Sequence, residues 1–133
     1  MPGPRVALLT IAAAVAVPLV LAPPSGAAAP TLPTRYTTYT DSSIEAGSDA
    51  GSITIKVGSD PHKIARIVIV AHCEDGKERF SRRNVAIKDG GRFSVAGGRY
   101  VSIEGRFRSQ HWATGSLTTN QCGFFGGDFS AKD

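Results

Sequence analysis

The chain is poor in cysteine and lacks the short motifs of several enzyme classes. Its two cysteines, Cys73 and Cys122, stand too far apart for a C-x-x-C redox or zinc motif. The three histidines, His62, His72 and His111, do not have metal-ligand spacing such as H-x-x-x-H. No G-x-S-x-G motif occurs, and no glycine-rich segment precedes a helix as in phosphate-binding loops. We therefore expect neither a metal site nor a cofactor.

Helical periodicity is also missing, since no segment carries apolar residues at helical spacing over three turns. Instead, short strand-like segments separated by glycine turns recur about every 8–12 residues. Ile53, Ile55 and Val57 alternate with polar residues, and the segment 101–107 alternates in the same way. The β-branched run 67–70 is typical of a strand covered on both faces. The pattern predicts an all-β fold, an antiparallel β-sandwich of about seven or eight strands.

Residues 1–28 have the pattern of a cleaved signal peptide. Arg5 supplies a positive charge, an apolar run follows from Val6 to Leu21, and small residues precede a cleavage site that we place after Ala27 or Ala28. A run of about 20 apolar residues could just span a membrane. However, Pro18 interrupts this one and no basic cluster follows it. The sequence therefore predicts a secreted protein with no stable membrane anchor.

The mature chain of about 105 residues is enough for one domain. We expect an extended or disordered lead-in over residues 29–43, with an edge strand around Arg35–Thr40, and a β-sandwich over 44–133. The full chain has a formal net charge of +4. Such a mild surplus favours weak attraction to anionic cell-wall polymers but does not by itself indicate nucleic acid binding. We expect a monomer by default.

Two cysteines in an exported domain predict one intramolecular disulfide, Cys73–Cys122. Closing a loop of about 50 residues would stabilise the fold by about 4 kcal/mol on the chain-entropy account. A redox pair and a metal site are the alternatives, and the spacing favours neither.

Several short motifs in the second half of the chain follow one another in a recognisable order. They are Asp89-Gly90-Gly91-Arg92-Phe93-Ser94, Val101-Ser102-Ile103-Glu104-Gly105-Arg106-Phe107, Ala113-Thr114-Gly115-Ser116-Leu117, and Cys122. This order resembles small exported bacterial proteins, many of them actinobacterial, with the pattern dG-x-F-s, v-x-I-x-G-x-F, A-x-G-x-L and C. The resemblance implies a β-sandwich whose first cysteine bonds the last. Such proteins are generally of unknown function, so it implies no catalytic residues.

Glu104, Arg106 and Arg108 occupy alternate positions of one expected strand, and His111 follows just beyond it. Small secreted ribonucleases pair a Glu general base with a His general acid, and Arg stabilises the phosphate. The other interpretation is a row of charged residues on the solvated side of a strand, loosely paired as Glu104 with Arg106.

A basic stretch contains Lys77, Arg79, Arg82 and Arg83. It could bind an anionic polymer such as teichoic acid, nucleic acid or heparin-like chains, although nearby acidic residues dilute its charge. The simpler interpretation is a solvated loop.

The aromatic residues suggest a different binding surface. Trp112 stands beside His111 in an expected turn, and Phe124-Phe125 is flanked by glycines. Planar side chains at loop tips can stack on sugar rings or anchor a protein partner. Alternatively, Trp112 caps the core and one of the two phenylalanines packs beneath it.

The leading hypothesis is a secreted, non-catalytic module that contacts a cell-envelope polymer, such as a polysaccharide, or an extracellular protein. It rests on compartment, fold class and the lack of a catalytic motif. The runner-up is a small secreted hydrolase, a ribonuclease that uses Glu104, Arg106 and His111. A protease inhibitor is the third hypothesis, although such scaffolds usually brace their reactive loop with more disulfides.

Overall fold

The computed structural model describes Gly3 and residues 32–47, 49–97 and 101–133. The expected signal peptide therefore lies, apart from Gly3, outside the described residues. In the described ranges no helix is long and apolar enough to cross a membrane. The regular elements are β1 Thr38–Ala46, β2 Asp49–Val57, β3 Lys63–Cys73, β4 Gly76–Ala86, the 3-10 turn η1 Asp89–Gly91, β5 Arg92–Gly97, β6 Val101–Ser109, β7 Trp112–Thr119 and β8 Phe125–Lys132.

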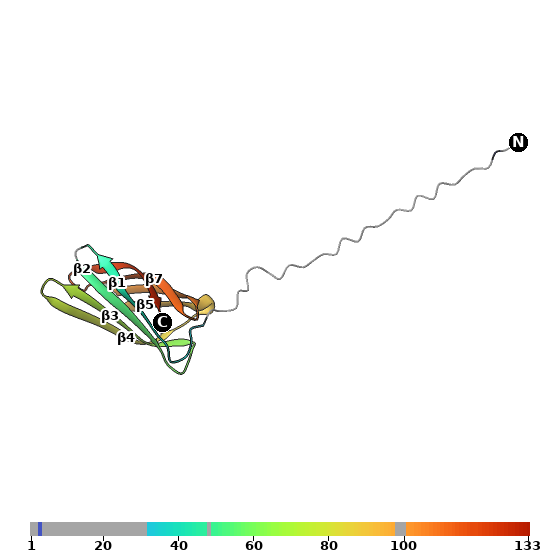
Figure 1. The fold of residues 1–133 in the computed structure, drawn as a ribbon, viewed down its shortest axis with the longest axis horizontal. Helices are drawn as coiled ribbons and strands as arrows, with labels where there is room; N and C mark the ends of the chain where they lie inside the picture. Colours follow the sequence, from blue (N-terminus) through green and yellow to red (C-terminus); the bar gives the residue numbers. More distant parts are fainter. Residues whose placement is uncertain (1–2, 4–31, 48, 98–100) are drawn as a thin grey trace.

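One antiparallel sheet contains all eight strands, in the order β4-β3-β2-β1-β8-β7-β6-β5. Strands β1–β4 form one meander and β5–β8 a second, and the two are joined where β1 lies beside β8. The sheet curls until its edge strands β4 and β5 are in contact, which gives a nearly barrel-shaped molecule. Figure 1 shows the two meanders on opposite sides of the fold, cyan to green and yellow to red. The predicted all-β antiparallel class is confirmed.

The core lies inside this curl and takes alternate residues from each strand. Ile53, Ile55 and Val57 of β2 are buried as their alternation predicted, as are Ile103 and Phe107 of β6. This alternation leaves the intervening polar side chains on the outer face of the sheet. The outer face therefore carries the residues available to a ligand.

Strand β1 is not at the edge of the sheet, which corrects the prediction of an edge strand over Arg35–Thr40. It begins at Thr38, within the expected lead-in 29–43, and lies between β2 and β8. Tyr39 is fully buried, with its ring 5.3 Å from that of Phe107. Its hydroxyl accepts the N–H of Thr34 at 3.0 Å and donates to the carbonyl of Gln110. A strand with few apolar residues is stable here because it has hydrogen-bonded neighbours on both sides.

The predicted disulfide is confirmed, with 5.3 Å between the Cα atoms of Cys73 and Cys122. It attaches the loop between β7 and β8 to the hairpin of β3 and β4. The buried amide of Gln121 strengthens this attachment, because its Nε2 donates to the carbonyls of Ile69 at 3.1 Å and Glu78 at 2.8 Å. The N–H of Cys122 donates to Oε2 of Glu78 at 3.0 Å. The loop is thus held by side-chain bonds as well as by the covalent link.

Candidate functional site

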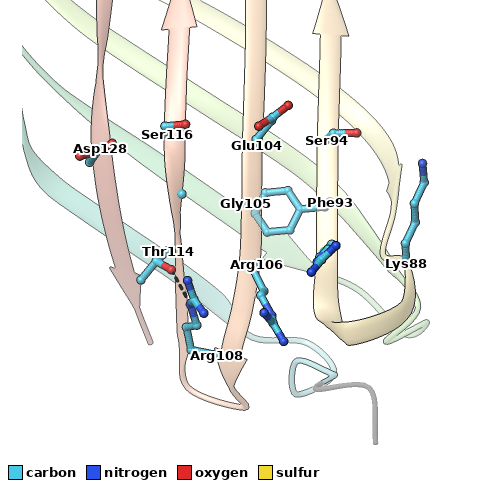
Figure 2. Close-up of a pocket in the computed structure, with 12 residues that line it drawn as sticks. Lys88, Phe93, Ser94, Glu104, Gly105, Arg106, Arg108, Thr114, Ser116 and Asp128 are labelled. Carbon is cyan, nitrogen blue, oxygen red and sulfur yellow. Dashed lines mark hydrogen bonds between the residues drawn. The ribbon is translucent and has the colours of Figure 1, made fainter. Parts of the chain in front are cut away.

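An open groove of about 650 Å³ lies on the outer face of β5–β8. Its walls are side chains that point outward from neighbouring strands. In Figure 2, these strands lie in front of those of the other meander. Residues opposite one another in an antiparallel pair point to the same side of the sheet. The side chains that line the groove therefore form rows that run across the strands. One row contains Ser94, Glu104, Ser116 and Asp128.

The next row begins with two arginines, since Arg92 is directly opposite Arg106. Lys88 and Arg108 add two further cations to the lining. In Figure 2, Arg106 and Arg108 lie at one end of the groove, and the carboxylates of Glu104 and Asp128 lie toward the other. The groove therefore has a basic end and a polar, partly acidic end.

The floor of the groove is backbone, because Gly105 and Gly115 are direct register partners. On the inner side, the rings of Phe93 and Phe129 lie against these two glycines. A Cβ added at Gly115 would be 2.7 Å from Cζ of Phe129, so no larger residue fits there without a shift. The ring of Phe93 in turn packs 5.4 Å from that of Phe107. The aromatic core thus supports the floor from beneath.

Two of the arginines are held in place by hydrogen bonds. Arg106 donates through Nε to the carbonyl of Gly90 at 3.0 Å, and Arg108 donates through Nε to Oγ1 of Thr114 at 2.9 Å. A guanidinium has five N–H donors, so each of these bonds leaves the Nη groups for a ligand. Such a planar fork suits bidentate contact with phosphate or carboxylate oxygens.

Among the described residues, no carboxylate lies within ion-pairing distance of the cations of the groove. The one ion pair in this part of the chain joins His111 to Asp133. The loose pair that we considered between Glu104 and Arg106 is therefore not formed. Arg92 and Arg106 face each other with like charges, an arrangement that costs stability in a sheet. An anionic ligand would supply the charge that the chain itself does not place there.

The structure brings together two of the three residues named for a ribonuclease. Glu104 and Arg106 both line the groove. His111 is not among the lining residues; it lies in the turn between β6 and β7, with its side chain 70% exposed and its Nδ1 2.7 Å from Oδ2 of Asp133. The sequence could not place His111, because a turn directs its side chains without the regular alternation of a strand.

Trp112 lies on the outer face of β7 and does not cap the core, which corrects that interpretation. Its side chain is 39% exposed, and its Nε1 donates to Oγ of Ser130 at 2.7 Å. The Nζ of Lys132 lies 5.8 Å from the ring centroid, a distance at which a cation is attracted to the face of an indole. On β7, Thr114 of the groove is the next outward residue after Trp112, so the indole extends the same face.

The neighbouring residues Phe124 and Phe125 differ in burial. Phe124 is 65% exposed and lines a smaller hollow of about 290 Å³, whereas Phe125 is fully buried in the core. Phe125 is therefore a residue of the core.

The basic stretch is part of β4 and is not a loop, which corrects the simpler interpretation. Lys77, Arg79 and Arg83 occupy alternate positions and share its outer face, while Arg82 is directly opposite the buried Ile67 and takes the other side. A strand without apolar alternation is stable here because β3 pairs with it along most of its length.

Sequence reasoning missed three charged residues of the groove: Lys88, Arg92 and Asp128. The sequence does contain a signal for Arg92, because this residue directly precedes the alternating residues of a short expected strand. However, only the strand register shows that Arg92 is opposite Arg106.

No family model, no curated protein and no solved structure matches this chain.

Proposed function

We propose that the chain is a secreted, non-catalytic β-sandwich module that binds an anionic polymer of the cell envelope through the groove on β5–β8. The observation that carries this proposal is the set of four cations in one groove without an ion-paired carboxylate among the described residues. Phosphates of a polymer would contact the arginine forks. The carboxylates of Glu104 and Asp128 and the hydroxyl groups of the lining would accept or donate hydrogen bonds to polyol or sugar hydroxyls.

The location of this function rests on two features. The N-terminal sequence has the pattern of a cleaved signal peptide, and a disulfide is compatible with an extracellular location. The motifs from Asp89 to Cys122 support membership of the small exported bacterial proteins with the same pattern. An extracellular protein partner is the weaker form of the hypothesis, because the groove is lined mainly by charged and hydroxyl side chains.

The test is binding of the purified mature domain to a polyol phosphate teichoic acid, with neutral dextran as the control polymer. Affinity should fall steeply as salt rises, because the contacts are ionic. The double variant Arg92→Gln with Arg106→Gln should bind more weakly, by about fivefold per cation removed. Arg79→Gln removes one positive charge from another strand and should change little. Equal binding by wild type and the double variant would refute the groove as the site.

Ribonuclease activity is a second hypothesis, favoured only by the presence of Glu104 beside Arg106 in the groove. A general acid other than His111 would be needed unless the turn rearranges. Hydrolysis of single-stranded RNA that is lost in Glu104→Gln but kept in His111→Ala would support a ribonuclease whose general acid is not His111. Absence of turnover in the wild type would remove the hypothesis.

A further inference from the structure

A second row of cations lies on the outer face of the other meander. Lys56 is directly opposite Arg66, and Arg66 is directly opposite Arg83. All three are on the outer face, since their neighbours Ile55 and Ile67 point into the core. Three like charges in a direct row across β2, β3 and β4 are unfavourable for the isolated fold. The side chain of Arg66 is fixed through a bond from Nε to Oγ of Ser81, at 2.9 Å.

The two basic rows lie at the same end of the sheet. Lys63 is opposite Ala86 at the last pair of β3 and β4, and Arg92 is the first residue of β5. The connection between β4 and β5 is short, and its Lys88 N–H donates to the carbonyl of Arg92 at 2.7 Å. The edge strands β4 and β5, which carry Arg83 and Arg92, are in contact with each other. We call the combined set the basic belt: Lys56, Arg66, Arg83, Lys88, Arg92 and Arg106.

Acidic residues gather at the opposite end, around the disulfide. A hollow there is lined by Asp49, Glu74, Asp75 and Glu78 beside Cys73 and Cys122. The hollow therefore concentrates carboxylates at the disulfide end, beside Lys77 at the start of β4. A polyanion would meet like charges at this hollow, whereas the belt offers it cations.

We propose that one anionic polymer chain occupies the whole belt, running across the strands from the groove, round the edge of β4 and β5, to Lys56. This inference rests on the proposed function of the groove and specifies how far the polymer extends. Neighbouring strands are about 4.8 Å apart, so the direct rows offer a cation at short, regular intervals. A linear polymer of phosphodiesters can follow such a row, whereas a single small anion would fill only the groove.

The experiment compares short and long poly(glycerol phosphate) chains as probes. The variant Arg83→Gln removes a cation of the belt that lies outside the groove. Arg79→Gln is its matched control, since Arg79 is exposed on the same face of the same strand but is opposite Val70, outside the belt. Arg92→Gln reports on the groove itself. Each variant is checked for its native fold by circular dichroism before binding is measured.

With the long probe, we expect Arg83→Gln and Arg92→Gln each to weaken binding about fivefold and to reduce the salt slope by about one. With the short probe, only Arg92→Gln should weaken binding. The control Arg79→Gln should match wild type with both probes.

Three results would overturn the belt. Full binding of the long probe by Arg83→Gln, with loss in Arg92→Gln, would confine the polymer to the groove and leave the proposed function standing. Equal losses in Arg83→Gln and Arg79→Gln would indicate unspecific attraction to β4. No effect of Arg92→Gln on either probe would refute the groove and the belt together.

Discussion

The carboxylate of Asp41 accepts a hydrogen bond from the backbone N–H of Ser130 at 2.7 Å, across a separation of 89 residues. This bond crosses the junction of β1 and β8, where the two meanders meet and the paired residues are Thr40 and Lys132. Beside it, the register of β1 with β2 shifts between Asp41 and Ile44. The side chain of Asp41 thus serves as a backbone-like acceptor for β8 where β1 bulges.

Ser43 completes the surroundings of this carboxylate, since its N–H and its hydroxyl both donate to Oδ1 of Asp41, at 2.9 and 2.7 Å. Burial acts to raise the pKa of Asp41, but the hydrogen bonds from Ser130 and Ser43 outweigh it, and the pKa is lowered overall. A lowered folded-state pKa means that the ionised carboxylate stabilises the fold above its unfolded pKa, near 3.8. That contribution is lost as the pH falls through the folded-state pKa.

We expect Asp41→Asn to lower the free energy of unfolding by about 1–2 kcal/mol at neutral pH, because a charged acceptor of three hydrogen bonds is lost. The difference from wild type should shrink as the pH falls from the unfolded pKa near 3.8 through the lower folded-state pKa, where the carboxyl of the folded protein becomes protonated. Urea unfolding at a series of pH values measures both effects. Asp60→Asn is the control, since the carboxylate of Asp60 accepts a local bond from the N–H of His62, two residues away. An unchanged difference at acid pH would contradict this role for Asp41.

We expect Gly115→Ala to destabilise the fold by about 3 kcal/mol, through overpacking. The new Cβ would contact the backbone of Glu104 and would lie 2.7 Å from both Cα of Gly105 and Cζ of Phe129. Gly58→Ala is the matched control, since its Cβ would meet only the Cβ of Ala65, at 3.6 Å. Thermal unfolding of the two variants measures the contrast. Similar melting temperatures would show that the floor of the groove is not closely packed.

We expect Gln121→Ala to cost about 2 kcal/mol, because it removes the buried amide that joins the carbonyls of Ile69 and Glu78. Asn120→Ala, at the exposed neighbouring position, should change stability by less than about 0.5 kcal/mol. Chemical denaturation with the disulfide intact separates the amide from the covalent link. A loss as small as that of the control would mean that the disulfide alone holds the loop.

We expect replacement of both cysteines, Cys73→Ala with Cys122→Ala, to lower stability by about 4 kcal/mol, since the closed loop spans 49 positions. The measurement is denaturant unfolding of the double variant beside the wild type under oxidising and reducing conditions. The wild type should approach the double variant once it is reduced. A wild type insensitive to complete reduction would show that the cross-link adds little to the folded state.

We expect Lys56→Thr to raise stability by about 0.5 kcal/mol, because it removes a like charge opposite Arg66 and places a good strand former opposite Thr38. High salt should reduce the part of the gain that comes from charge repulsion. Thermal unfolding at low and high salt measures this. A loss of stability at low salt would show that Arg66 and Lys56 do not repel each other in the fold.

Much of the fold could be predicted because it depends on local alternation. Ile53, Ile55 and Val57 point inward, and so do Ile103 and Phe107, as their spacing in the chain indicated. The interior position of β1 was not predicted, because Tyr39 is its first large buried side chain and the neighbouring residues are small and polar. Its stability comes from hydrogen-bonded strands on both sides, a feature that no local pattern contains.

The candidate site was predicted in part for the same reason. Glu104, Arg106 and Arg108 share a face because they occupy alternate positions of one strand, and this needs no partner strand. The meeting of Arg106 with Arg92, and the separation of both from His111, depend on register and on the path of a turn.

The amino-acid order alone determined the all-β class, the inward and outward faces of most strands, and the pairing of its two cysteines. The class and the faces follow from a two-residue period, which is a property of neighbouring positions. The cysteine pairing follows from composition, because two cysteines allow one intramolecular disulfide. Tertiary structure decided which strands are neighbours, and therefore that Asp41 joins Ser130 and that Lys56, Arg66 and Arg83 form a row. Register depends on contacts between distant segments, so the charged surface of this protein exists only once the sheet has curled.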